Sequence, residues 1–91
     1  MNEVDDAILE FLAQQGDELT IPPTVVWYNL VEVHGMLSKS QETVARRMRK
    51  LPELGLLEKA DETRGYYRIT EKGQAYLAGE LDAEDLEKPD E

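Results

Sequence analysis

The sequence predicts a mostly α-helical domain with a small β-hairpin, and three observations support this fold class. Apolar residues recur at helical spacing in several stretches of the chain. A glycine or proline, which can end a helix, follows each of the first three stretches. Two short runs, 56–60 and 66–70, have the length of strands and are separated by the polar turn 61–65. A chain of 91 residues is long enough for one small domain with one core. It contains no cysteine, so no disulfide can stabilise this domain.

The first helix is predicted to begin after Asn2, whose side chain can cap it, and to end at Gly16. Asp5 and Asp6 fall in its first turn, near the positive end of the helix dipole, and we expect both to be solvated. The apolar residues that recur at helical spacing are Val4, Ile8, Leu9, Phe11 and Leu12. This stripe predicts that the helix packs one face against the core.

A short extended segment is predicted over 18–21, followed by a second helix over 23–34. Pro23 suits the first position of that helix, where its missing N–H costs nothing, and Gly35 can adopt the left-handed stop. Trp27 lies within this helix. The indole could serve as a stacking platform, but a large aromatic side chain in so small a domain favours a place in the core.

The third helix is predicted over 40–51, capped by Ser38 or Ser40. Pro52 has no N–H and clashes with the carbonyl of the preceding turn, so the regular helix should end or kink near Leu51. The residues predicted to face the core, at spacings of four and three, are Val44, Met48 and Leu51.

In the second strand Tyr67 and Ile69 share a face, which leaves Arg68 on the other face. Thr70 then caps a last helix, which we expect to continue to about Leu86 before it frays. Helix, short strand, two helices, hairpin and helix is the order of a winged helix-turn-helix domain. That domain is predicted to span residues 1 to 80, and residues 81 to 91 form an acidic C-terminal extension.

Charge is distributed unevenly along the chain, whose net charge is -10. Residues 1–38 contain seven acids and no Lys or Arg, whereas residues 39–72 contain nine Lys or Arg against six acids. Residues 73–91 return to seven acids against one Lys. Such acidity is typical of proteins from extreme halophiles, in which negative charge maintains solubility, and it also occurs in acidic domains of mesophiles. The positive segment contains the third helix, so this helix is the candidate contact for nucleic acid.

The candidate DNA-binding residues are the basic and polar side chains on or beside the third helix and on the hairpin. A helix that presents arginines opposite its apolar face can enter the major groove, while a turn such as 61–65 touches the backbone. Glu42 lies on the same face and can either accept from a cytosine amino group or repel phosphate. The simpler alternative is an ordinary solvated face. The candidates are Lys39, Ser40, Gln41, Thr43, Arg46, Arg47, Arg49, Lys50, Arg64 and Arg68.

Two stretches, TVARRMRKLPELGLLEK (43–59) and YYRITEKGQAYL (66–77), resemble winged-helix transcriptional regulators of archaea. The chain is similar to the repressor-like group of halophilic archaea and their phages. The resemblance implies that Gln41, Thr43, Arg46 and either Arg49 or Lys50 contact the major groove, and that Arg64 contacts DNA from the wing. Pro52 and Glu42 depart from the commonest pattern.

These observations together predict a sequence-specific regulator of transcription that binds double-stranded DNA, acting as a cytoplasmic homodimeric repressor. No nucleophile with a base, phosphate loop, metal-ligand cluster or membrane segment is apparent in the sequence, so we expect no enzyme activity, cofactor, metal, membrane or small-molecule partner. The alternative is a winged helix that binds a protein in a transcription or chromatin assembly, and the net charge favours it because an acidic chain is repelled by DNA.

Overall fold

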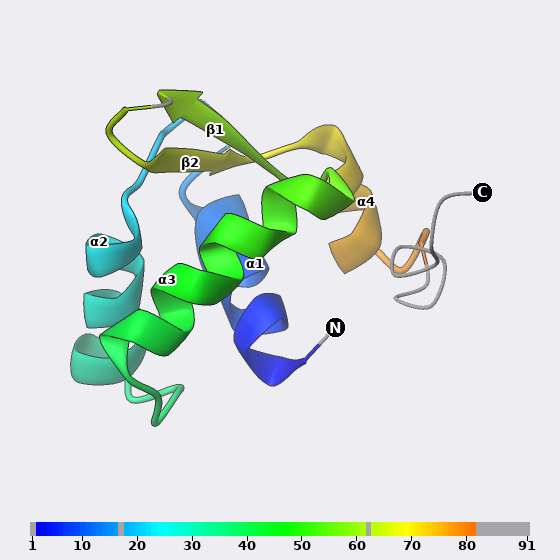
Figure 1. Cartoon of the computed structure of the whole chain (residues 1–91). Helices are drawn as coiled ribbons and strands as arrows, with labels where there is room; N and C mark the ends of the chain where they lie inside the picture. The colour runs from blue at the N-terminus through cyan, green and yellow to red at the C-terminus, as the bar shows by residue number, and fades with distance from the viewer. Residues whose placement is uncertain (1, 17, 62, 82–91) are drawn as a thin grey trace.

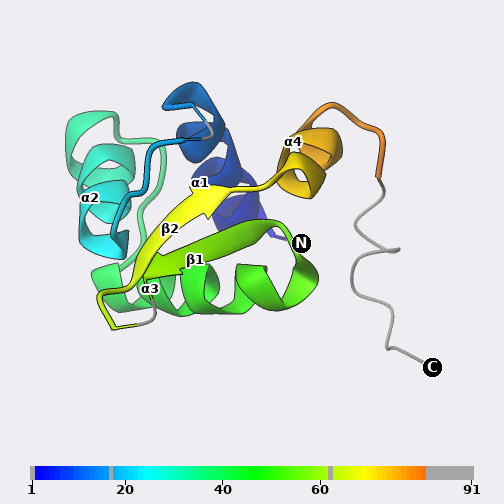
Figure 2. The ribbon, with the colours of Figure 1, turned by 90° about the horizontal axis from the view of Figure 1, so that it is seen from above.

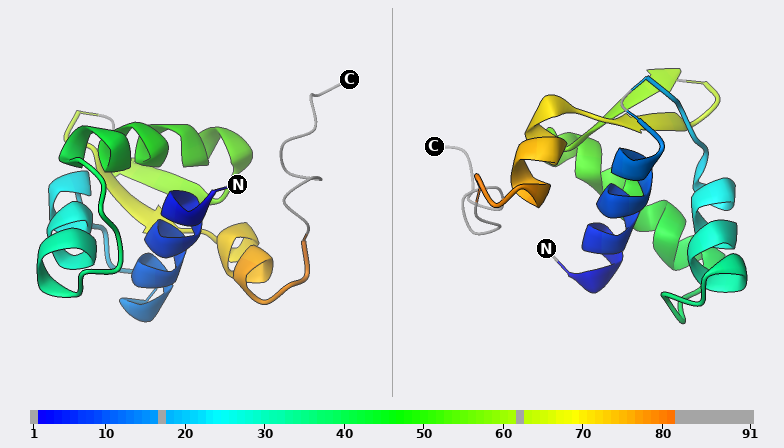
Figure 3. Two further views of the ribbon diagram at one scale, coloured as in Figure 1. Left: turned by 90° about the horizontal axis from the view of Figure 1, so that it is seen from below. Right: turned by 180° about the vertical axis from the view of Figure 1, so that it is seen from behind.

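A computed structural model describes residues 2–16, 18–61 and 63–81, and every structural statement below concerns these residues. Figure 1 shows helix α3 (Gln41–Lys50) crossing in front of α1 (Glu3–Gln14), with α2 (Pro23–Trp27) on one side, the hairpin above and α4 (Glu71–Leu77) on the opposite side. The views from below and behind show α1 directly against α3 (Figure 3). The predicted fold class, mostly α with a β-hairpin wing in a winged helix-turn-helix order, is confirmed.

Helix α1 spans Glu3–Gln14 and begins at the predicted cap, Asn2. The side chain of Asn2 accepts from the backbone N–H of Asp5 at 2.9 Å, and the Asp5 carboxylate accepts from the backbone N–H of Asn2 at 3.2 Å. This reciprocal capping box satisfies two donors that the helix itself cannot pair. The helix therefore starts where the sequence predicted.

Helix α2 spans Pro23–Trp27 and continues without interruption into η1, Tyr28–Val33, which has π-helical hydrogen bonding. The predicted helix over 23–34 is thus confirmed as one helical segment whose second half is wider than an α-helix. The side-chain amide of Asn29 donates to the carbonyl of Val25 at 2.9 Å. A side chain that enters the carbonyl ladder in this way is a recognised cause of local helix distortion.

Helix α3 spans Gln41–Lys50 and is capped by Ser40, the second of the two predicted serines. It then tightens into the 3₁₀ turn η2, Leu51–Leu54, which contains Pro52 at its start. Proline is tolerated there because the first turn of a helix does not need its N–H. Pro52 therefore ends the α-helix one residue before the predicted end, and the chain continues in a tighter helix.

The hairpin consists of β1, Leu57–Asp61, paired antiparallel with β2, Tyr66–Ile69 (Figure 2). The register shifts between Lys59 and Asp61, which marks a bulge close to the turn. Ile21 exchanges two backbone hydrogen bonds with Tyr67, at 2.7 and 3.1 Å. The extended segment predicted over 18–21 therefore adds a single bridge to the edge of the hairpin.

The core lies where α1, α2, α3 and the inner face of the hairpin meet. All three residues predicted for the buried face of α3 are fully inaccessible, and the predicted inner residues of β2 are also buried. The alternation predicted for β2 is therefore confirmed. The buried apolar side chains are Val4, Ala7, Ile8, Leu9, Leu12, Ile21, Val26, Leu30, Leu37, Val44, Met48, Leu51, Leu56, Leu57, Tyr67 and Ile69.

Helix α4 spans Glu71–Leu77, and the prediction that it extends to about Leu86 is wrong for the residues the structure describes. Gly79 adopts a φ of 82°, a left-handed conformation that terminates the helix. The segment 82–91, which includes the rest of the predicted acidic extension, lies outside the described residues. Within the described part of the chain, no helix has the length and apolar character needed to cross a bilayer.

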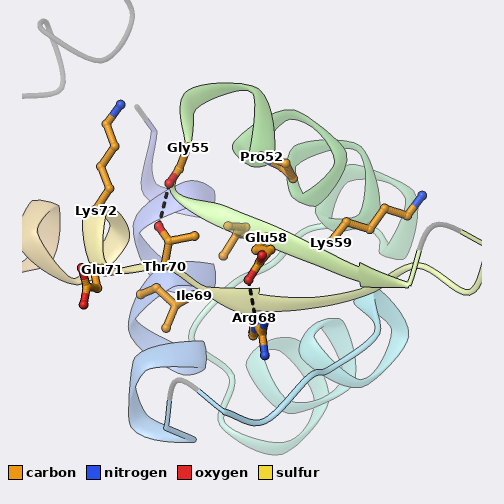
Figure 4. Close-up of a pocket in the computed structure, with 10 residues that line it drawn as sticks. Pro52, Gly55, Glu58, Lys59, Arg68, Ile69, Thr70, Glu71 and Lys72 are labelled. Carbon is orange, nitrogen blue, oxygen red and sulfur yellow. Dashed lines mark hydrogen bonds and ion pairs between the residues drawn. The ribbon is translucent and has the colours of Figure 1, made fainter.

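Thr70 and Gly73 join the hairpin to α4. The Thr70 hydroxyl accepts from the backbone N–H of Gly73 at 3.0 Å and donates to the carbonyl of Gly55 at 2.6 Å (Figure 4). A Cβ added at Gly73 would lie 2.4 Å from the carbonyl oxygen of Leu56 and 2.7 Å from a side-chain carbon of Ile69. Glycine at this position therefore allows α4 to pack directly against the hairpin.

Replacing Gly73 with alanine is expected to destabilise the domain. The new methyl group meets backbone that cannot move without disturbing β1, and such overpacking costs about 1–3 kcal/mol. Urea denaturation followed by circular dichroism measures the change in the free energy of unfolding. The control is Gln74→Ala, at an exposed position of the same helix, which should change it by less than about 0.5 kcal/mol. Equal stability of the Gly73→Ala variant and the wild type would contradict the close packing.

Candidate nucleic-acid interface

The outward face of α3 carries Arg46, Arg49 and Lys50, and all three side chains are exposed. They lie three and four residues apart, which places them on one side of an α-helix. The opposite side is buried against α1, α2 and the hairpin, so the helix cannot rotate to hide them. The predicted division of α3 into a core face and a basic outer face is therefore confirmed.

The N-terminal end of α3 is capped by Ser40 and joined to α2 by a side-chain hydrogen bond from Gln41. The Ser40 hydroxyl accepts from the backbone N–H of Thr43 at 3.1 Å and lies 2.9 Å from the Thr43 hydroxyl. The Gln41 amide donates to the hydroxyl of Thr24 at 3.1 Å. These three predicted DNA-binding residues thus sit together at the exposed start of α3, where they also fix its position.

Trp27 fixes the loop before α3. Its indole N–H donates to the carbonyl of Lys39 at 3.0 Å, while the ring packs at the edge of the core. The stacking-platform interpretation of Trp27 is therefore replaced by a packing role. The exposed side chain of Lys39 is in turn placed beside the first turn of α3.

Arg47 requires a correction, because its guanidinium is turned away from the outer face and is bound to α1. Its Nε donates to Asp5 Oδ1 at 2.7 Å and its Nη2 donates to Asp5 Oδ2 at 2.8 Å. The Asp5 side chain is 0% exposed and the Arg47 side chain is 27% exposed. Both fork donors are used by one buried carboxylate, so Arg47 positions α3 against α1 and is not part of the exposed basic face.

Asp5 fixes the position of α3 through Arg47, a structural role that the sequence analysis does not predict. It was expected to be solvated at the start of α1, yet it is the one fully buried charged side chain in the described part of the chain. A signal was present in its spacing, because Asp5 precedes Leu9 by four residues and Leu12 by seven, on the core stripe of α1. A carboxylate on an apolar stripe must be paired when it is buried, and Arg47 supplies the pair.

The other cations of the candidate set differ in their partners. Four of them lie close to a carboxylate of the chain itself, whereas no carboxylate of a described residue lies within 4.0 Å of the Arg46 guanidinium or the Lys39 ammonium. Arg46 therefore presents a guanidinium to solvent without an ion-pair partner among these residues. The pairs are Arg49–Glu42 at 3.2 Å, Lys50–Glu53 at 3.4 Å, Arg64–Asp61 at 3.8 Å and Arg68–Glu58 at 2.8 Å.

The two hairpin arginines occupy different places. Arg64 lies in the turn at the tip, with its side chain 73% exposed. Arg68 lies on the outer face of β2, where Figure 4 shows it directly opposite Glu58 of β1. The same close-up shows Lys72 of α4 and Lys59 of β1 on opposite sides of this pair. The structure thus gathers the α3 residues on one face and places Arg64 and Arg68 apart from them on the hairpin.

The turn of the hairpin is organised by Asp61. Its carboxylate accepts from the hydroxyl of Thr63 at 2.8 Å and from the backbone N–H of Thr63 at 2.9 Å. These two hydrogen bonds, the hydroxyl first, lower the pKa of Asp61 below its ordinary value of 3.8, because both donors favour the charged form. The turn that carries Arg64 is therefore shaped by an ionised aspartate.

The lowered pKa predicts how the wing responds to acid. A carboxyl with a depressed pKa in the folded state contributes stability that is present above its unfolded pKa and is lost as the pH falls through the folded pKa. The Asp61 carboxyl carbon, followed by NMR, should therefore titrate with a midpoint below 3.8. Thr63→Ala removes the main cause and should move the midpoint upward. A midpoint at or above 3.8 in the wild type would contradict this arrangement of the turn.

Known proteins with this sequence pattern and fold support a common origin. Residues 1–89 match the family described as winged helix-turn-helix phage repressor. The chain is 33% identical over 89 residues to the repressor protein of Halobacterium phage phiH. The aligned region covers 97% of this chain and 91% of that protein.

A solved structure shows the same arrangement. The crystal structure of the PhiH1 repressor-like protein from Haloarcula marismortui superposes with a TM-score of 0.73 at 35% sequence identity, over 91% of this chain and 83% of that one. The resemblance seen in the two sequence stretches thus extends over nearly the whole chain and over its three-dimensional fold. The chain belongs to the winged helix-turn-helix phage repressor family.

Proposed function

We propose that this chain is a repressor that recognises a specific sequence in double-stranded DNA, with α3 in the major groove. Membership of a repressor family assigns the chain to DNA-binding regulators rather than to enzymes. The observation that carries the finer proposal is the exposed Arg46 at the centre of the outer face of α3. An arginine presented in this way can donate two hydrogen bonds to the edge of a guanine.

The dimensions of α3 suit this role. An α-helix with its side chains is about 10–12 Å across, and the major groove is about 12 Å wide. Contacts from α2 and α1 hold α3 at the surface of the domain (Figure 3). The basic side chains Arg46, Arg49 and Lys50 are exposed on this helix. The pair Arg47–Asp5 adds an anchor that is independent of the apolar core.

The proposed contacts follow from the positions of the side chains. Residues at the start and middle of a recognition helix reach base edges, while residues beside it and on the wing contact phosphates. Arg47 is excluded because Asp5 uses its guanidinium. The proposed major-groove contacts are Gln41, Thr43, Arg46 and either Arg49 or Lys50, and the proposed backbone contacts are Lys39, Ser40, Arg64 and Arg68.

The charge of the chain predicts an unusual response to salt. Phosphate contacts make binding weaker as the salt concentration rises, in proportion to the number of phosphates neutralised. Here the net charge is -10, and several of the proposed contact cations already have a carboxylate beside them. Binding then neutralises few phosphates, so the affinity must depend on base contacts and on the fit between the protein and the DNA. We infer a shallow salt dependence and binding that persists in molar salt.

We also propose that the repressor acts in the cytoplasm as a homodimer on a two-fold symmetric operator. Two copies would place two α3 helices in successive major grooves, with half-sites about 34 Å apart. A winged-helix domain can repress simply by occupying a promoter. The proposed contacts between copies are the first helix and the C-terminal segment. Leu77 and Leu81 of that segment are half-buried and pack against the core of the same chain.

Selection of bound duplexes from a random pool, at both low and high salt, tests the proposal. The expected result is a palindromic sequence that is enriched at both salt concentrations, with a complex whose mass corresponds to two chains per duplex. The absence of any enriched duplex at either salt concentration would contradict the proposal. If a protein then co-purified with the chain through the face of α3, the winged helix would instead be a protein-interaction module.

A further inference from the structure

Glu42 and Arg49 form an ion pair along the outer face of α3. Arg49 Nη2 donates to Glu42 Oε1 at 3.2 Å, although the two residues are seven positions apart, which is two helical turns. Side chains on a helix lean toward its N-terminus, so the Arg49 guanidinium extends back over the turn that carries Arg46. The pair therefore lies across the surface proposed to face the bases.

We propose that Glu42 is a specificity-determining residue, which releases Arg49 only on a duplex that offers a cytosine amino donor to its own carboxylate. This inference rests on the proposed DNA-binding function. In the free protein, the Glu42 carboxylate pairs with the Arg49 guanidinium, which would otherwise attract the phosphates of any duplex. On the matching sequence, Arg49 moves to DNA, and the Glu42 carboxylate accepts from the amino group of a cytosine.

Exposure and charge explain why the pair can discriminate. The Glu42 side chain is 69% exposed and the Arg49 side chain is 56% exposed, so the bond between them is weak and exchanges readily. A duplex without a correctly placed donor would confine the released carboxylate in the negatively charged groove without a partner. A duplex that leaves the Glu42 carboxylate unpaired is bound more weakly, and this repulsion adds selectivity to the attractive contacts.

Position distinguishes Glu42 from the other carboxylates paired with basic residues. It lies in the first turn of α3, and the N-terminal residues of a recognition helix are those that contact base edges. Glu53 pairs with Lys50 from the 3₁₀ turn beyond the end of α3, and Glu58 pairs with Arg68 on the hairpin. Of these three carboxylates, Glu42 alone belongs to α3 itself.

The test compares Glu42→Gln with the wild type on two probes, a duplex selected by the wild type and a random-sequence duplex of equal length. Glu10→Gln is the control, because it removes the same charge from an exposed position of α1. For Glu42→Gln we expect binding to the random duplex to tighten by about fivefold or more, with a logarithmic salt dependence steeper by about one. Binding to the selected duplex should weaken or stay unchanged, so the ratio between the two probes should fall.

A second variant shows whether Glu42 acts through Arg49. In the background of Arg49→Ala, the Glu42→Gln change should tighten binding to the random duplex by a smaller factor, because no guanidinium remains to be released. The inference is overturned if Glu42→Gln changes both probes no more than Glu10→Gln does, or if it leaves their ratio unchanged. In that result the wild type still discriminates between the probes, so the proposed function stands. Wild-type protein that binds neither probe would overturn both.

Discussion

Asp5→Ala is expected to lower the free energy of unfolding by about 3 kcal/mol, the largest effect of a single substitution that we predict on stability. Removing one member of a buried ion pair costs about 3–5 kcal/mol, and the partial exposure of Arg47 places this case at the lower end. The variant leaves the Arg47 guanidinium without its bidentate carboxylate and removes half of the capping box at Asn2. Urea denaturation monitored by circular dichroism measures the loss.

Two controls separate the buried pair from general effects of charge. Glu3→Ala removes an exposed acid from the same helical turn and should cost less than about 1 kcal/mol. Replacing both partners, as Asp5→Leu with Arg47→Met, should restore much of the loss, because two apolar side chains of similar size leave no unpaired charge. An Asp5→Ala variant as stable as Glu3→Ala would contradict the structural role of the pair.

The boundaries of the helices were largely predictable because they depend on neighbours in the sequence. Ser40 and Thr70 cap the helices that follow them through bonds to residues three positions away, and such local chemistry is visible in a linear pattern. The widening of the second helix at η1 was not predictable from periodicity. The predicted extension of α4 is wrong because Gly79 adopts a left-handed conformation that ends the helix, although leucines recur beyond it.

The sequence predicts which side chains of α3 face outward, but it does not predict which carboxylates pair with the basic ones. The period of α3 determines which side of the helix faces the core, so the outward position of Arg46 followed from Val44 and Met48 alone. The pairing of Arg47 joins residues 42 positions apart in sequence and depends on how α1 and α3 pack. Long cationic side chains can reach several acids, and only the folded chain determines which one is close enough.

The separation of Arg46 from Arg47 is informative about function. The two adjacent residues have the same side chain, yet one holds the helix to the domain and the other is directed to solvent. Rigid support beneath an exposed guanidinium suits the proposed base contact of Arg46, because a hydrogen-bonded fork tolerates little displacement.

Arg46→Ala is accordingly expected to weaken binding to the selected duplex by about 1–3 kcal/mol, roughly 5- to 150-fold in Kd, with much less effect on a random duplex. The reason is the loss of a bidentate contact to one guanine, which carries sequence information that a phosphate contact does not. Fluorescence anisotropy on the two duplexes at fixed salt measures both affinities. Thermal denaturation should show an unchanged fold, because the side chain is exposed.

Lys72→Ala is the matched control, since it removes one exposed positive charge from α4, on the far side of the hairpin from the tip that carries Arg64 (Figure 1). It should change both affinities by less than about twofold, the scale of a distant charge screened by salt. Arg46→Lys distinguishes a base contact from simple attraction, because lysine retains the charge but lacks the planar fork. If lysine restores full discrimination, Arg46 acts as a point charge. If Arg46→Ala weakens both duplexes equally, its contact is with the phosphate backbone, and sequence must be read by other residues of α3.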